Sequence, residues 1–223
     1  MKKIKHALHL LVLIAMAGSA NAQTQKTNNM ADQMKPKFGV KGGYNIAKMT
    51  GSTPSFSPGN KSGFMVAAFY SPSGGSGMGY RTEIAFSRQG FSYDSMGNKM
   101  NVRQDYIYLP QFTTFNISKY FQIQAGVQLG FLLNAVKSKD SSGAPGVDII
   151  EAYNKIDYGL AGGVEIYPNK SVIIGARYNI SLGPMYKRQE EQMSNPNPIP
   201  LPFNPDELKG KNSVINFYLG FRF

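Results

Sequence analysis

Apolar and polar residues alternate along much of this chain, most regularly over residues 121–131. Odd positions in that segment carry apolar side chains, and even positions carry glutamine or glycine. A period of two places successive side chains on opposite faces of a β-strand, whereas a helix would mix the two kinds. The same alternation recurs over residues 157–166, 172–182 and 213–223. The second half of the chain therefore predicts four strands, each with one apolar and one polar face.

Four less regular segments come earlier in the chain. Residues 38–48 and 80–87 alternate, whereas residues 63–70 are apolar on both faces. Residues 106–116 contain Pro110, which cannot donate a ladder hydrogen bond and predicts a local break or bulge. Together the two halves predict eight strands, with lengths near the ~9–11 residues that a tilted membrane strand needs.

The predicted connections alternate in length along the chain. The long ones are residues 49–60, 88–105, 136–155 and 183–212, and the short ones are residues 71–79, 118–120 and 167–170. A meander with both ends on one side collects every long loop at the opposite end, which is the layout of outer-membrane barrels. A soluble lipocalin-like barrel, apolar inside, is the alternative. We predict an all-β protein: an eight-stranded antiparallel up-and-down transmembrane β-barrel over residues 37–223.

The start of the chain has the three parts of a secretory signal peptide. Lysines precede residues 8–17, which are apolar except for His9, and Ala20-Asn21-Ala22 forms a small-x-small cleavage site. The apolar run is too short to serve as a membrane anchor. We expect residues 1–22 to be a cleaved signal peptide and the polar residues 23–36 to be a disordered periplasmic leader. The expected location is the bacterial outer membrane.

The composition excludes most catalytic chemistry. Both histidines, His6 and His9, lie in the signal peptide, and the chain has no cysteine. The mature protein therefore lacks a Ser-His or Cys-His nucleophile pair, a His-ligated zinc site and any disulfide. A paired-carboxylate hydrolase or a hard-cation oxygen site stays open, but no residue spacing points to either. We expect no enzyme, with no catalytic residue, no metal and no cofactor.

The chain ends in an aromatic strand, residues 217–223. A last strand with an aromatic final residue resembles the signature that the outer-membrane assembly machinery reads. We expect Phe221 and Phe223 to carry this assembly signal. A final amphipathic strand can pair with the first one and leave no exposed edge in the membrane.

Several short motifs occur in a fixed order from Phe38 to the end of the chain. They are FGVKGGYN at residues 38–45, YIYLP at 106–110, DYGLAGGVEI at 157–166 and GARYN at 175–179. This ordered set resembles the PorT-like outer-membrane β-barrel family of Bacteroidetes type, also described as porin-family barrel proteins. The resemblance implies an eight-stranded barrel and supplies no catalytic residues. One namesake member acts in protein secretion, and we do not carry that role over to this chain.

If the apolar face contacts lipid, the other face lines the lumen and carries four cations and three carboxylates. These seven residues are Lys41, Arg81, Arg177 and Arg222 with Glu83, Asp157 and Glu165. Eight strands leave room inside for side chains and little more. Buried charges are costly unless they are paired. The sequence therefore allows two interpretations, a structural ionic core or a narrow, gated ion path.

The last long connection is rich in proline. Residues 195–205 carry five prolines, which make the segment stiff and extended, with Ile199, Leu201 and Phe203 between them. These apolar side chains either dock a protein or polysaccharide partner or fold over the barrel mouth. The formal charge of +11 falls to +8 when the three signal-peptide lysines are removed, and it suits anionic lipid headgroups or lipopolysaccharide.

Three functions follow from these patterns. The first is an integral outer-membrane barrel with a structural or interaction role through its external loops. The second is a small pore or channel for ions or small solutes, and the third is a soluble lipocalin-like ligand-binding barrel. The expected partners are outer-membrane lipids, lipopolysaccharide and the assembly machinery. Export and dispersed charge argue against nucleic acid, and we expect a monomer.

Overall fold

The computed structural model describes residues 36–51, 56–72, 77–95, 97–139, 146–194, 199, 201 and 203–223. The expected signal peptide and nearly all of the expected leader lie outside these ranges, so both stay predictions. Among the described residues, no helix combines the length and the apolar character needed to cross a membrane.

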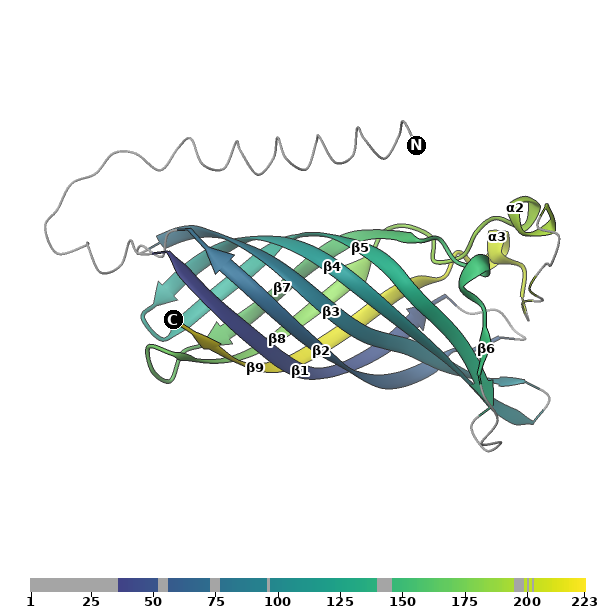
Figure 1. Cartoon of the computed structure of the whole chain (residues 1–223), viewed down its shortest axis with the longest axis horizontal. Helices are drawn as coiled ribbons and strands as arrows, with labels where there is room; N and C mark the ends of the chain where they lie inside the picture. The colour runs from purple at the N-terminus through teal and green to yellow at the C-terminus, as the bar shows by residue number, and fades with distance from the viewer. Residues whose placement is uncertain are drawn as a thin grey trace, which may run out of the picture.

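The described residues form nine strands and three short helices (Figure 1). The strands are β1 (Lys37–Thr50), β2 (Gly59–Ser71), β3 (Gly77–Ser95), β4 (Asn98–Ser118), β5 (Phe121–Lys139), β6 (Val147–Asp148), β7 (Ile156–Ile166), β8 (Val172–Ser181) and β9 (Lys211–Arg222). The helices are η1 (Ile150–Ala152), α2 (Gln189–Met193) and α3 (Pro205–Leu208). Eight strands pair in an antiparallel ring that β9 closes against β1, while β6 adds only to β5. The predicted eight-stranded barrel is confirmed.

The two faces of the ring differ as a membrane barrel requires. On β5, Gln122 and Gln124 are buried inside, whereas Ile123 and Val127 are exposed outside. Large apolar side chains are exposed in the same way on the other ring strands. An apolar belt of this extent is stable against lipid and costly in water. The structure therefore has the lipid-facing arrangement and not the apolar interior of a lipocalin.

The predicted long loop over residues 88–105 is wrong. β3 and β4 continue through it and meet at a tight turn, in which Gly97 has a φ of +76° that glycine adopts without strain. Arg88 pairs directly with Asp105. β5 likewise continues to Lys139 inside the predicted loop 136–155. These extensions lack an apolar outer face, so a search for membrane-type alternation does not detect them.

Pro110 interrupts hydrogen bonding without a bulge. Its pairing with Gln128 on β5 is in register, whereas Leu109 and Pro110 have no partner in the ladder to β3. The missing N–H of proline accounts for this break. The β4–β5 ladder shifts register elsewhere, between Asp105 and Tyr106, opposite the extra residue Leu133, and again between Asn116 and Ser118.

The inside and outside of the barrel exchange polarity along β3. The inward face carries Arg81 and Glu83, and farther along it carries Phe91 and Tyr93. The outward face is apolar up to Phe86 and becomes polar at Arg88. Beyond that level lies a region that we call the cap, the described parts of residues 49–59, 88–105, 132–155 and 182–211. It lies at the end of the barrel opposite the C-terminus (Figure 1).

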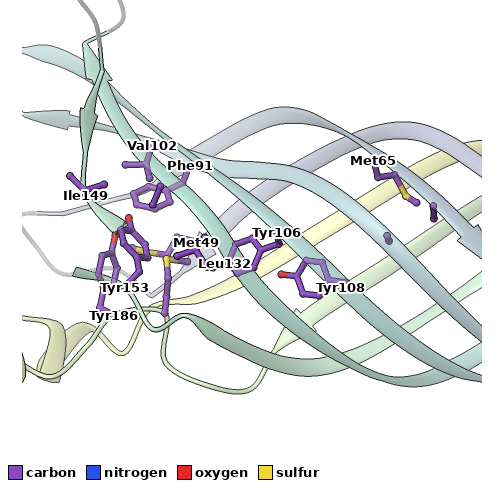
Figure 2. Close-up of a cluster of buried hydrophobic side chains, with 14 of the residues drawn as sticks. Met49, Met65, Phe91, Val102, Tyr106, Tyr108, Leu132, Ile149, Tyr153 and Tyr186 are labelled. Atoms are coloured by element: carbon purple, nitrogen blue, oxygen red, sulfur yellow. Dashed lines mark hydrogen bonds between the residues drawn. The ribbon is translucent and has the colours of Figure 1, made fainter. Parts of the chain in front are cut away.

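The cap has an apolar core of its own. Figure 2 shows Met49, Phe91, Val102, Tyr153 and Tyr186 gathered inside it, with the two tyrosines side by side. These side chains come from β1, β3, β4 and the two long connections that follow β5 and β8. The cap interior is thus mainly apolar, whereas the interior of the membrane part mixes charged and amide side chains with buried apolar ones such as Phe69 and Ile173.

Candidate functional site

Five charged side chains meet in the lumen at the level of the apolar belt. They come from four strands: Lys41 from β1, Arg81 and Glu83 from β3, Glu165 from β7 and Arg177 from β8. The inward phase of each strand aims them at the barrel axis. Their side chains are at most 3% exposed. We call these five residues the ionic network.

Glu83 is bound by two cations. Arg177 donates two hydrogen bonds to Glu83, from Nη1 to Oε2 at 2.9 Å and from Nη2 to Oε1 at 3.0 Å. Lys41 Nζ lies 2.5 Å from the same Oε1. A forked arginine–carboxylate pair is among the strong, directional hydrogen-bonded contacts. Glu83 therefore ties β3 to β8 and β1 across the lumen.

Glu165 completes the ionic network from the opposite wall. Arg81 Nη1 lies 2.7 Å from its Oε2, and Lys41 Nζ lies 3.1 Å from its Oε1. Tyr218 and Tyr167 donate their hydroxyls to the two oxygens at 2.9 and 2.6 Å. Lys41 bridges both carboxylates, so all five charges form one connected unit.

Aromatic rings and an amide fill the remaining space around the charges. The guanidinium of Arg177 lies 4.3 Å from the Phe112 ring centroid, and that of Arg81 lies 4.5 Å from Phe69. Gln124 donates to the Tyr218 hydroxyl at 2.6 Å. Cations over ring faces gain further electrostatic stabilisation when they are desolvated. The lumen at this level is packed from wall to wall.

Two of the seven charges predicted for the lumen lie apart from the ionic network. Asp157 is buried nearer the cap, where it accepts hydrogen bonds from the Tyr108 hydroxyl at 2.9 Å and the Ser181 hydroxyl at 2.6 Å. Arg222 is half-buried at the rim beside the chain ends. Its Nε donates to the Lys170 carbonyl at 2.7 Å, and its guanidinium lies 3.9 Å from the Tyr167 ring centroid.

The placement of Arg222 corrects the grouping made from the sequence. Its Cα partner is Gly39, close to the start of β1. At this edge of the ring the side chain reaches the turn after β7 instead of the lumen interior. Arg222 is the last residue of β9, so it follows the alternation of the strand but has no barrel wall around it.

A small cavity, lined by both apolar and polar side chains, lies on the cap side of the ionic network. It is bordered by Arg177 and by the amides of Gln128, Asn179 and Asn216. Its volume of about 20 Å³ accommodates about one water molecule. No solute-sized passage exists at this level of the described interior.

The two long connections of the cap are tied to each other. Tyr153 and Tyr186 form a backbone β-bridge, their hydroxyls are 3.0 Å apart, and their ring centroids are 4.6 Å apart. Burial raises the pKa of both tyrosines well above the ordinary value. Glu151 accepts hydrogen bonds from Lys155 and Lys187, which hold the pKa of its carboxyl below the ordinary value. The cap is therefore a folded unit and not a set of separate loops.

The described apolar residues of the proline-rich segment face inward. Ile199, Leu201 and Phe203 are partly buried against the apolar core of the cap. The Phe203 ring centroid lies 4.5 Å from that of Phe56 and 5.0 Å from that of Tyr186. Of the two alternatives, the structure has the one in which these side chains fold over the barrel mouth. Pro200 and Pro202, which lie between them, are outside the described residues.

Some residues of the site were missed by sequence reasoning. Gln124, Tyr167 and Tyr218 contact the ionic network. Gln124 on β5 and Tyr218 on β9 fall on the inward, polar face of their strands, so the alternation could have identified them. Gln104 on β4 is fully buried, and both polar atoms of its amide lack a hydrogen-bond partner in the described structure. Within the described ranges, no three acidic side chains come together to hold a metal ion.

The chain is similar in fold to solved bacterial outer-membrane proteins. Ail of Yersinia pestis, solved in complex with the heparin analogue sucrose octasulfate, has 18% identity over 85% of this chain and 100% of its own, with a TM-score of 0.46. Neisserial surface protein A has 13% identity over 83% and 97%, with a TM-score of 0.49. OprG of Pseudomonas aeruginosa has 11% identity over 86% and 97%, with a TM-score of 0.43.

No curated protein matches the chain. A family model described as an outer membrane protein beta-barrel domain matches residues 21–187. The match covers well over half of the chain and includes seven of the eight ring strands. The chain belongs to the outer membrane protein β-barrel domain family.

Proposed function

We propose that this outer-membrane barrel is a closed scaffold that presents its cap outside the cell, where the cap binds partners, and that it performs no catalysis. The observation that carries this proposal is the ionic network. Lys41 alone contacts two carboxylates on opposite walls, at 2.5 and 3.1 Å. An ion crossing the lumen would have to separate these pairs, and leaving one buried charge without its partner costs roughly 3–5 kcal/mol.

The cap supports the interaction part of the proposal. A pore has no need for an apolar core outside the membrane, yet the cap buries Phe91, Tyr153 and Tyr186 almost completely. Connections that are already ordered lose little conformational entropy when a partner binds, so such a surface is preorganised for recognition. We propose that its exposed polar residues contact a protein or a polysaccharide.

Finer assignments belong to the same proposal. The ordered motifs that begin with residues 38–45 favour the PorT-like branch of the family. Residues 1–22 would be the cleaved signal peptide, residues 23–36 the periplasmic leader and residues 37–223 the barrel domain. Phe221 and Phe223 are more than half exposed at the end of β9, where the assembly machinery would read them. The folded barrel would be a monomer.

Conductance in planar lipid bilayers tests the closed scaffold. We expect the refolded wild-type protein to insert without discrete current steps at any moderate voltage. The variant Glu83→Gln/Arg177→Gln removes both charges of the forked pair and shortens the side chain at position 177, and it should begin to pass small ions. Steady unitary currents from the wild type would overturn the proposal and favour the small-pore alternative.

A further inference from the structure

Four neighbouring strands of the ring contain no acidic residue. These are β2, β1, β9 and β8, which adjoin one another in the sheet. The acidic residues of the ring strands, Glu83, Asp94, Asp105, Asp157 and Glu165, are all on β3, β4 and β7. One side of the barrel thus carries cations without acids.

The outward face of this side is an apolar panel. Phe64, Tyr44 and Phe217 are cross-strand partners in one row over β2, β1 and β9, and they are 43%, 50% and 52% exposed. Ile46 and Ile215 form the next row toward the cap. We call these five residues the apolar panel. Its exposed area fits the acyl chains of the surrounding lipid.

Two lysines stand directly above the apolar panel, at the cap end of the same strands. Lys48 pairs with Ser213, and Lys211 pairs with Thr50. The two lysines are therefore diagonal neighbours on the outward face, with Cβ atoms within roughly 7–8 Å. Both lie where the outward face changes from apolar to polar, which is the level of lipid headgroups.

No carboxylate of the described residues lies within 4 Å of either lysine. The nearest acids along the chain are on α3 and have other contacts. Asp206 accepts from the Gln189 N–H at 3.3 Å, and Glu207 accepts from the Asn204 amide at 3.2 Å. The positive charge above the apolar panel is thus locally uncompensated.

Several other cations of the cap are paired with acids. Arg88 makes two hydrogen bonds to Asp105, at 2.7 and 3.2 Å. Lys155 and Lys187 both contact Glu151, at 3.2 and 3.4 Å. This contrast separates Lys48 and Lys211, which have no acidic partner among the described residues and lie above the apolar panel, from the paired cations of the cap.

We propose that Lys48 and Lys211 bind the phosphate of an outer-leaflet glycolipid whose acyl chains lie on the apolar panel. Ser213 and Tyr178, hydrogen-bonded to each other at 2.9 Å, place hydroxyl groups beside the lysines at the headgroup level. Lysine suits a phosphate because its ammonium is a compact point charge with three donors. The lysines would bind the anionic headgroup of one lipid molecule while the apolar panel contacts the acyl chains of the same molecule.

Native mass spectrometry of the barrel released from nanodiscs tests this site. The nanodiscs contain phosphatidylcholine with either a bisphosphorylated lipid A or its dephosphorylated form. The wild type should retain the phosphorylated glycolipid. The variant Lys48→Gln/Lys211→Gln should lose roughly tenfold in retained lipid, because each lysine near an anionic headgroup contributes separately. Heat-modifiable gel migration checks that each variant is folded.

The matched control is Lys99→Gln/Lys170→Gln, which removes the same charge at the β3–β4 turn and at the opposite rim. It should retain lipid as the wild type does. Equal loss in this control would show that net charge alone governs retention and would overturn the site. Equal retention of the dephosphorylated glycolipid by the wild type would overturn the role of the phosphate.

Discussion

The membrane part of this barrel and its cap are built on the same strands with opposite polarity. Within the membrane, Glu83 and Arg177 are inside and Ile84 is outside. In the cap, Phe91 and Val102 are inside, while Arg88 and Arg103 are outside. β3 and β4 cross from one region to the other without a break. The surrounding medium, lipid or water, thus decides which residues a strand places outward.

The interiors of the two regions are stabilised in different ways. The ionic network stabilises through hydrogen-bonded charge pairs, so its parts are interdependent and the loss of one leaves others without partners. The cap core stabilises through apolar burial, and its losses are graded with the volume removed. We expect mutations in the two regions to differ in how far their effects spread.

The largest expected effect is in the ionic network. Glu83→Ala or Arg177→Ala should each destabilise the barrel by roughly 3–5 kcal/mol, because each change leaves a buried charge without its partner. The measurement is the temperature at which the folded gel band disappears in detergent. The control Glu151→Ala removes an exposed acid and should change that temperature little. Unchanged melting of both network variants would refute a stabilising role for the ionic network.

The next effect is confined to the cap. Phe91→Ala should cost roughly 3–5 kcal/mol of cap stability, because the ring is 1% exposed and its removal leaves a cavity. Faster amide exchange in residues 88–105 should report this, while the folded gel band of the membrane part persists. The lipid-facing Phe217→Ala is the control and should leave cap exchange unaltered. Loss of the whole barrel with Phe91→Ala would show that the two regions do not fold independently.

A stabilising substitution is expected at the boundary between the regions. Gln104 is fully buried with an unpaired amide, so Gln104→Met should stabilise by roughly 1–3 kcal/mol while keeping the shape. Gln124→Met is the contrast, because the Gln124 amide is bonded to Tyr218 and Arg177 and its loss should destabilise. Thermal melting of the two variants should shift in opposite directions, and a shared direction would contradict this assignment.

The smallest effect is a pH dependence in the cap. The pKa of Glu151 is lowered in the folded state, so its contribution to stability is present above the ordinary carboxyl pKa and is lost as the pH falls through the lower, folded value. Protease cleavage within residues 146–155 should therefore rise in acid. Glu151→Gln should flatten that pH profile. An identical profile in wild type and variant would assign the acid sensitivity to another group.

Strands and faces could be predicted from the sequence where the medium is lipid. Residues 121–131 alternate cleanly because lipid and lumen impose opposite demands on adjacent side chains. Residues 88–105 do not meet that criterion because water surrounds them on the outside, so the sequence predicts a loop where the structure has strands. Lys41 and Glu165 could be grouped because both occupy inward positions in the alternation of their strands. Arg222 also occupies an inward position, but it lies at the rim.

The sequence by itself determined the alternation, the number of strands in the ring and six of the seven charges that face inward, all but Arg222, because a period of two is a local property of the backbone. Only the tertiary structure decided which charges meet. Lys41 and Glu165 are 124 residues apart and contact each other only after the ring closes in its observed register. It also decided that Ile199, Leu201 and Phe203 face inward, because the cap core that they cover is assembled from distant strands and connections.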